Sequence, residues 1–192
     1  MTWIQTFDGR AFDLADPQPT GIDPVALATC LGRLVRFAGH TRQAYTVAQH
    51  SVLVSRFVRR PELRLPALLH DAHEAYSGFG DVSRPAKQLD AAVAAWLDAH
   101  ERRIDAAIAA RFGFDPILFR HPEVKEADLI ALATEARDLL GPPPRAWDRL
   151  PPPDPRHIDP WKERRASSEF LVLLRMLTNT CPDYERNTTW TK

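Results

Sequence analysis

Four titratable side chains stand together in the segment LPALLHDAHEAYSGFGD, residues 65–81: His70, Asp71, His73 and Glu74. They come directly after an apolar stripe at helical spacing, the pattern of a helix that buries one face. A carboxylate beside a buried face is costly unless a cation or several hydrogen-bond donors satisfy it. A divalent metal ion would meet that need. The segment therefore indicates either a metal site or a buried ionic network.

Two further residues can complete such a site from other parts of the chain. His50 ends the first turn of a predicted helix over 46–58, and Asp128 lies among apolar residues of a predicted helix over 122–140. Together with His70 and Asp71, these residues would supply two imidazoles and two carboxylates. This donor set suits Co, Mn, Zn, Fe, Ni or Mg better than a metal that prefers thiolates. Spacing alone leaves the ionic network open as the alternative.

The elements that must position these side chains are nearly all helical. A short β-hairpin is predicted around Asp8 and Gly9, and neither a strand–helix alternation nor an internal repeat follows it. The first predicted helix begins after Asp23, carries Val35 on its apolar face and stops by Gly39. Further helices are predicted over residues 46–58, 65–77, 89–112, 122–140 and 161–177. The fold prediction is all-α: a compact helical bundle with a short N-terminal β-hairpin.

Length and composition predict one domain spanning residues 1–192, with 44% apolar and 26% charged residues. Residues 141–160 hold 8 of the 17 prolines and are predicted to be an extended crossing loop within that domain. We do not expect them to separate two domains, because a single last helix is too short to fold alone.

The overall charge excludes some classes of partner. The 25 basic residues equal the 25 acidic ones, so no global field favours a nucleic-acid polymer or a membrane surface. The two cysteines, Cys30 and Cys181, form neither a disulfide framework nor a CxxC motif. Neither a signal peptide nor an apolar run of ~18 residues is evident, so we expect a cytoplasmic protein.

Four ordered blocks of the sequence resemble the HD-domain metal-dependent phosphohydrolases, most closely the phage dATP triphosphohydrolases and the small bacterial 5'-deoxynucleotidases. The blocks are RFAGHTRQAYTVAQHS, ALLHDAHEAY, GDVSRPAK and VKEADLIALATEARDL. The resemblance implies an HD-domain bundle, one tightly held divalent metal ion, additional Mg²⁺ arriving with a triphosphate substrate, and a homo-oligomer. The cyclic dinucleotide phosphodiesterase branch is a poorer match, since the sequence has no GYP.

The resemblance also implies roles for single residues. The metal ligands that it implies are His50, His70, Asp71 and Asp128. Glu74 matches the acidic residue that activates water or assists a leaving group. Asp81 matches a second catalytic carboxylate, although the loop between these two acids is two residues longer than in the usual pattern.

Residues flanking these blocks are the candidates for substrate binding. They are Arg36, Gly39, His40, Arg42 and Lys87. Arg36 would hold a phosphate through a planar two-pronged contact, and Lys87 would act as a mobile point charge. Gly39 would let a ring approach the backbone closely. The alternative for each basic side chain is an exposed position without a ligand.

The leading hypothesis is an enzyme acting on small-molecule deoxynucleotides. The most specific form is a dNTP triphosphohydrolase of the dATP type, which releases tripolyphosphate and a nucleoside. Alternatives are a 5'-deoxynucleotidase that releases orthophosphate from dNMPs, a non-catalytic nucleotide-binding module, and a purely structural ionic network.

Overall fold

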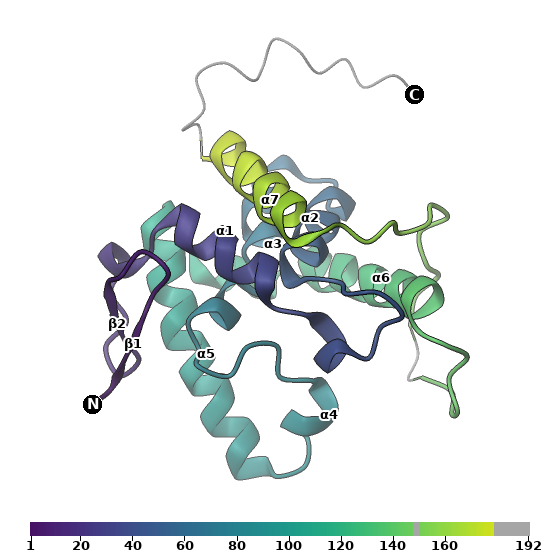
Figure 1. Cartoon of the computed structure of the whole chain (residues 1–192), viewed down its shortest axis with the longest axis horizontal. Coiled ribbons are helices and arrows are strands. Elements are labelled where there is room, and N and C mark those ends of the chain that lie inside the picture. The colour runs from purple at the N-terminus through teal and green to yellow at the C-terminus, as the bar shows by residue number, and fades with distance from the viewer. Residues whose placement is uncertain (148–149, 179–192) are drawn as a thin grey trace.

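A computed structural model describes residues 1–147 and 150–178 of the chain, and this part is mainly helical (Figure 1). The strands are β1 (Trp3–Gln5) and β2 (Ala11–Asp13). The α-helices of the described part are α1 (Pro24–Arg33), α2 (Val47–Phe57), α3 (Arg64–Leu68), α4 (Arg84–Lys87), α5 (Ala91–Phe112), α6 (Pro122–Leu139) and α7 (Glu163–Leu177). The predicted all-α fold with an N-terminal hairpin is confirmed.

The hairpin packs onto the helices through its inward-facing residue. β1 and β2 pair antiparallel, with Ile4 opposite Phe12. Phe12 is buried and its ring stacks on Tyr76 at a centroid distance of 4.4 Å. Gly9 in the connecting turn has a φ of 81°, a conformation that glycine adopts without strain.

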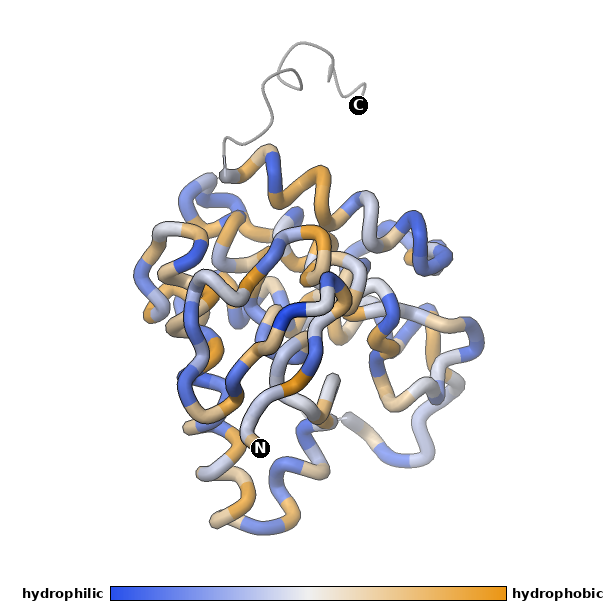
Figure 2. The backbone as a smooth tube through the Cα atoms, turned by 60° about the vertical axis from the view of Figure 1, so that its left-hand side comes forward, coloured by the Kyte–Doolittle hydropathy of each residue, from blue (hydrophilic) through white to orange (hydrophobic). Residues whose placement is uncertain are grey.

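Helix α2 is central to the bundle and packs against α1, α3, α6 and α7. The side chain of Thr46 caps it by accepting a hydrogen bond from the N–H of Gln49. One apolar cluster joins α2 to α1, α5 and α7, and a smaller one joins it to α3 and α6. Polar and apolar residues alternate along the helices, as amphipathic packing around a shared core requires (Figure 2). Within the described residues, no helix combines the length and apolarity needed to cross a bilayer.

The segment before α7 crosses the molecule without helix or strand at its described positions, as predicted. The buried Gln49 anchors it: its amide donates to the carbonyl of Asp159 at 2.8 Å and accepts from the N–H of Trp161 at 2.7 Å. α7 begins at Glu163, two residues later than predicted. The inward face of α7 then joins the larger apolar cluster.

The first predicted helix is too long. α1 ends at Arg33, and Val35 forms an isolated antiparallel bridge with Thr46 and is 38% exposed, so its predicted place on an apolar helix face is wrong. Backbone bonds explain the change: the N–H of Arg36 donates to the carbonyl of Tyr45 at 2.9 Å. This short ladder ties the start of α2 to the segment after α1.

The helix predicted over 65–77 is also interrupted. α3 ends at Leu68, and a separate 3₁₀ turn, η4, covers Ala72–Ala75. Nδ1 of His70 donates to the carbonyl of Ala67 at 2.9 Å. A continuous α-helix would use that carbonyl for the N–H of Asp71. The imidazole therefore helps to end the helix where the predicted ligands begin.

Candidate metal centre and adjoining cavity

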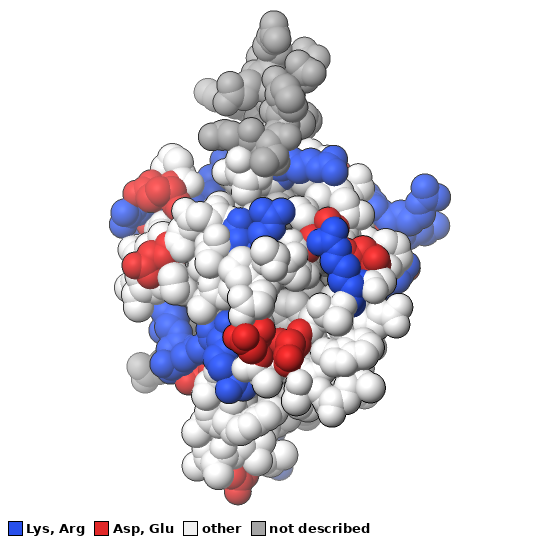
Figure 3. All heavy atoms as spheres, turned by 90° about the vertical axis from the view of Figure 1, so that its left-hand side faces the viewer, with Lys and Arg blue, Asp and Glu red and all other residues white. Residues whose placement is uncertain are grey.

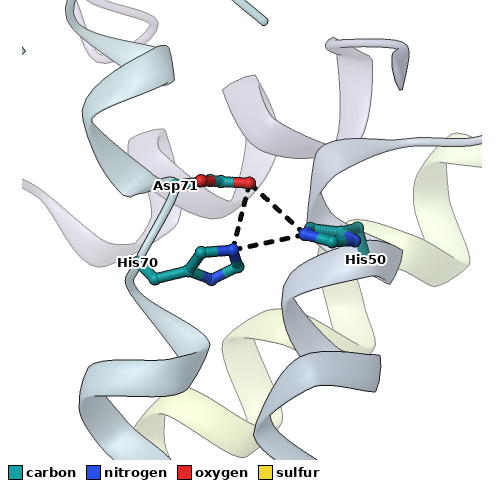
Figure 4. A group of neighbouring side chains, drawn as sticks. All are labelled: His50, His70 and Asp71. Atoms are coloured by element: carbon teal, nitrogen blue, oxygen red, sulfur yellow. Dashed lines mark hydrogen bonds and ion pairs between the residues drawn. The ribbon is translucent and has the colours of Figure 1, made fainter. Parts of the chain in front are cut away.

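Two histidines and two aspartates face one another between α2, α6 and the turn after α3 (Figure 4 draws the first three). They are His50, His70, Asp71 and Asp128. The two Nε2 atoms of His50 and His70 lie 3.2 Å apart, and Oδ2 of Asp71 lies 3.4 Å and 3.2 Å from them, respectively. Oδ1 of Asp128 lies 3.2 Å from Nε2 of His50 and 3.8 Å from Nε2 of His70. The structure thus brings all four predicted ligand residues together.

These separations fit the donors of one divalent ion. At metal–ligand distances of about 2.0–2.2 Å, neighbouring donors around a tetrahedral or octahedral ion lie about 3.0–3.5 Å apart. Ligand atoms of His50, His70 and Asp71 all lie within 4.8 Å of one another. The donors are nitrogen and oxygen only, which suits the hard and borderline divalent ions. The group therefore has the chemistry and spacing to hold such an ion.

The centre attracts cations strongly. Burial opposes protonation of His70, but Asp71 and Asp128 raise the pKa of this imidazole to about 10. Burial and Arg36 oppose protonation of His50, but the neighbouring carboxylates, Glu135 first, raise its pKa well above the usual value. A metal ion would replace protons here, because a ligating imidazole must be neutral.

Glu135 supports this centre from the side of the core, and sequence reasoning did not identify it. Its side chain is fully buried, and its Oε1 accepts a hydrogen bond of 2.6 Å from Nδ1 of His50. This bond directs Nε2 of His50 toward the other ligands, the usual arrangement around metal-ligating histidines. Glu135 comes seven residues after Asp128, about two helical turns along the same face of α6. This spacing from Asp128 is the sequence signal that could have identified Glu135.

Arg36 joins two carboxylates of the centre. Nη1 of Arg36 lies 3.3 Å from Oδ2 of Asp71, and its Nε lies 3.2 Å from Oε2 of Glu135. Its side chain is only 11% exposed. Burial opposes the charge, but Glu135 and Asp71 hold the pKa of Arg36 above its ordinary value. Phosphate binding by Arg36 stays a prediction, and its described ion pairs are with these two acids.

Glu74 is buried on η4 and has an unsatisfied oxygen. Its Oε2 has no hydrogen-bond partner among the described residues. Burial, reinforced by the charges of Asp71 and Asp81, raises the pKa of Glu74 to about 8. Buried polar atoms without a partner are rare in native proteins and often belong to functional sites. This carboxyl group is therefore free to exchange a proton near the candidate ligands.

The loop from Glu74 to Asp81 is two residues longer than the usual pattern, yet it brings Asp81 close to the candidate ligands. The backbone of Phe37 and the side chains of Arg36 and Asp71 lie near enough to the carboxyl group of Asp81 to affect its pKa. Burial is the largest effect and raises the pKa of Asp81, with Arg36 opposing it. Asp81 thus shares the environment of Glu74, on the opposite end of the loop.

The segment near Asp81, residues 37–39, is strained. Phe37 and Ala38 have φ values of 55° and 50°, and Gly39 follows with 79°. Non-glycine residues in this region cost on the order of 1–3 kcal/mol each and often occur at functional sites. His40 and Arg42 follow with exposed side chains, and no contact within the described residues joins them to the ligands. Substrate contacts by Gly39, His40 and Arg42 stay predictions.

A cavity of about 540 Å³ opens directly beside the centre, with His70 and Asp128 in its wall. Its remaining charged lining comes from η4, α4, α5, η5 (Pro116–Arg120) and α6: His73, Arg84, Asp98, Glu101, Asp105, Arg120 and Lys125. Arg120 is paired with Asp98 at 2.9 Å. Arg84 and Lys125 have no ion-pair partner within the described ranges.

Two further ion pairs involve the lining residues Glu101, His73 and Asp105. Nζ of the predicted substrate residue Lys87 lies 2.7 Å from Oε1 of Glu101. Nδ1 of His73 lies 3.0 Å from Oδ1 of Asp105. Burial opposes the charge, but Asp105 and its neighbours raise the pKa of His73 to about 9. A ligand in the cavity would meet His73 and Glu101.

Comparison with known proteins places the chain in a family. No protein-family model matches the sequence. The chain is 40% identical over 144 residues to a protein of Escherichia coli (strain K12) described as "Uncharacterized protein YfdR", a match that covers 72% of this chain and 73% of the relative. That description assigns no activity to the relative. The chain belongs to the same family as Escherichia coli YfdR.

Proposed function

We propose that this protein is a metal-dependent phosphohydrolase of the HD-domain type that acts on deoxynucleotides, most specifically a dNTP triphosphohydrolase. The observation that carries the proposal is the meeting of His50, His70, Asp71 and Asp128 at metal-ligand spacing. A structural ionic network would not need the neighbouring Glu74 oxygen that is buried without a partner.

The chemistry requires a stronger nucleophile than neutral water. A bound divalent ion would lower the pKa of a coordinated water and neutralise phosphoryl oxygens as charge shifts during attack. The residues to hold it are the two histidines and two aspartates, and Glu135 orients His50 among them. Arg36 fixes Asp71 and Glu135 relative to each other.

Proton transfer falls to the two remaining carboxyl groups. Glu74 accepts a proton from the attacking water as the new P–O bond forms, and its ionised form is required for this step. Nearby cationic charge would lower the pKa of Glu74 from about 8, which favours that form at neutral pH. Asp81, whose pKa is raised, donates a proton to the nucleoside 5' oxygen as the old P–O bond breaks.

The cavity supports a polyphosphate substrate. Its volume of about 540 Å³ lies within the usual range for small-molecule sites. Arg84 and Lys125 line it without ion-pair partners within the described ranges, so each can bind a phosphate oxygen. Lys87, which is ion-paired to the lining residue Glu101, can exchange this partner for phosphate. Arg84 and Lys125 can contact more than one phosphate of a triphosphate, and Mg²⁺ bound to that substrate would offset the acidic lining residues Asp98, Glu101, Asp105 and Asp128.

The product of hydrolysis decides between the forms of the proposal. The purified chain would be stripped of metal, reloaded in turn with Co²⁺, Mn²⁺ and Mg²⁺, and incubated with panels of dNTPs and dNMPs. Phosphorus NMR should show tripolyphosphate from dATP, and orthophosphate from dAMP alone would instead identify a 5'-deoxynucleotidase. Stepwise loss of single phosphates would contradict the one-step reaction. Binding without turnover under every metal would leave a nucleotide-binding module.

A further inference from the structure

The first turns of α5 are apolar but exposed. Residues 91–97, AAVAAWL, hold no charged or polar side chain, yet Val93 and Trp96 are 50% and 53% exposed. Leu89, just before the helix, is 87% exposed, and Phe79 is 55% exposed. A helix that is apolar on all sides belongs in a buried environment. We call these four residues, Phe79, Leu89, Val93 and Trp96, the apolar spur.

The spur has a fixed shape. The ring of Trp96 lies 5.8 Å from Phe79 in an edge-on contact and stacks on His100 at 5.2 Å with an interplanar angle of 12°. His100 is buried and its Nε2 donates to the carbonyl of Ser77 at 3.0 Å. The aromatic rings are therefore held in place before any partner binds, which lowers the entropic cost of association.

We infer that the apolar spur is the interface between two copies of this chain. Figure 3 shows the lower end of the molecule, over the start of α5, as mostly uncharged. The four side chains of the spur carry no charge that would select an oppositely charged partner, and a two-fold pair places them against one another without like-charge contacts among them. Equal numbers of acidic and basic residues also leave no net repulsion between copies.

The available area agrees with a weak, specific dimer. Aromatic side chains bury about 150–250 Å² each when fully covered, and leucine and valine bury somewhat less. Two aromatic and two aliphatic residues that are at least half exposed therefore offer at most on the order of 500 Å² per copy. Two copies would then bury roughly 1,000 Å², the lower end for specific interfaces. The exposed alanines between the large residues let two helices approach closely. This inference is independent of the proposed activity.

A matched pair of valine variants tests the interface. Sedimentation velocity of the full chain over a micromolar concentration series should show a species of twice the 21.7 kDa of one chain. Val93→Glu would bury two unpaired carboxylates in the dimer, so we expect the dissociation constant to rise by at least about 100-fold. Val172→Glu, at a 38% exposed position on α7, should leave the dimer unchanged. Leu89→Glu repeats the test at a side chain that is 87% exposed in the single chain.

Three results would overturn the inference. The first is a wild-type chain that stays monomeric at every concentration. The second is a dimer that survives both Val93→Glu and Leu89→Glu in variants with unchanged circular dichroism. The third is a monomer that co-sediments with phosphatidylcholine vesicles through this patch, which would assign the spur to a lipid surface.

Discussion

On the core side of the ligand cluster the charged groups are paired, whereas toward η4 and the cavity some are not. Glu135 is bonded to both His50 and Arg36, and Arg36 continues to Asp71. On η4, Glu74 has a buried oxygen without a partner among the described residues, and in the cavity wall Lys125 has no ion pair within the described ranges. An unsatisfied buried polar group costs about 1–3 kcal/mol. The core side therefore fixes the ligands, and the cavity side is left ready for a ligand.

The largest expected effect comes from removing a ligand. In Asp128→Asn the carboxylate that α6 contributes to the centre is lost, and we expect the hydrolysis rate to fall at least about 1,000-fold because ion and activated water are lost together. Steady-state assays with saturating metal measure this loss. Glu126→Gln, on an exposed position of the same helix, is the matched control. Equal hydrolysis rates for Asp128→Asn and Glu126→Gln would show that Asp128 is not a metal ligand.

Glu74→Gln separates proton transfer from metal binding. The amide cannot accept a proton from water, so kcat should fall about 100- to 1,000-fold while the metal content stays at the wild-type level. Elemental analysis and kinetics on one preparation measure both quantities. A variant that loses its metal together with its activity would assign Glu74 to the ligands instead.

Glu135→Gln tests the core side. The amide still fills the buried space, but it supports the imidazole of His50 less strongly, so we expect metal affinity to fall about 10- to 100-fold. High metal concentration should restore most of the activity, which a merely misfolded variant would not allow. An unchanged metal dissociation constant would show that the 2.6 Å bond to His50 has no role in orienting it.

Lys125→Ala tests the cavity side and should have a smaller effect. Losing one phosphate contact at a partly solvated position should raise KM for a dNTP about 10-fold, with little change in kcat. Lys162→Ala, at an exposed position outside the cavity, serves as the control. If KM for a dNMP rises as much as KM for a dNTP, Lys125 does not contact the outer phosphates of the triphosphate.

The smallest effect concerns the stability of the metal-free chain. The pKa of His70 is raised from 6.5 to about 10, so its contribution to stability is full below pH 6.5 and is lost as the pH rises toward 10. The pKa of Glu74, raised to about 8, acts in the same direction. Calorimetry should therefore show the unfolding temperature falling by a few degrees between pH 7 and 9.5. Saturating metal should reverse this trend, and a flat profile without metal would be inconsistent with the raised values.

Periodicity and capping residues predicted most of the fold. The helices around His50 and Asp128 lie within one residue of their expected ends, because each buries one apolar face and Thr46 caps the first of them. The break after α3 was missed, since it depends on a bond from His70 to the carbonyl of Ala67. No helical pattern contains that information.

The site was predictable only in part for a similar reason. Residue type and order identified the four ligand residues, but only the three-dimensional packing brings Asp128 beside the two imidazoles. Glu135 was overlooked because an acidic residue in a helix usually faces solvent. Its full burial next to Arg36 follows from the bridge between Val35 and Thr46, which is a tertiary feature.

Metal stoichiometry tests the central claim most directly. Co²⁺ titrated into the metal-free chain should bind tightly at one ion per chain, release protons, and produce visible absorption bands of a nitrogen and oxygen donor set. Asp128→Asn should weaken this binding strongly, and Glu126→Gln should not. A wild-type chain that binds no stoichiometric ion, or an Asp128→Asn variant that binds as tightly as wild type, would contradict the account.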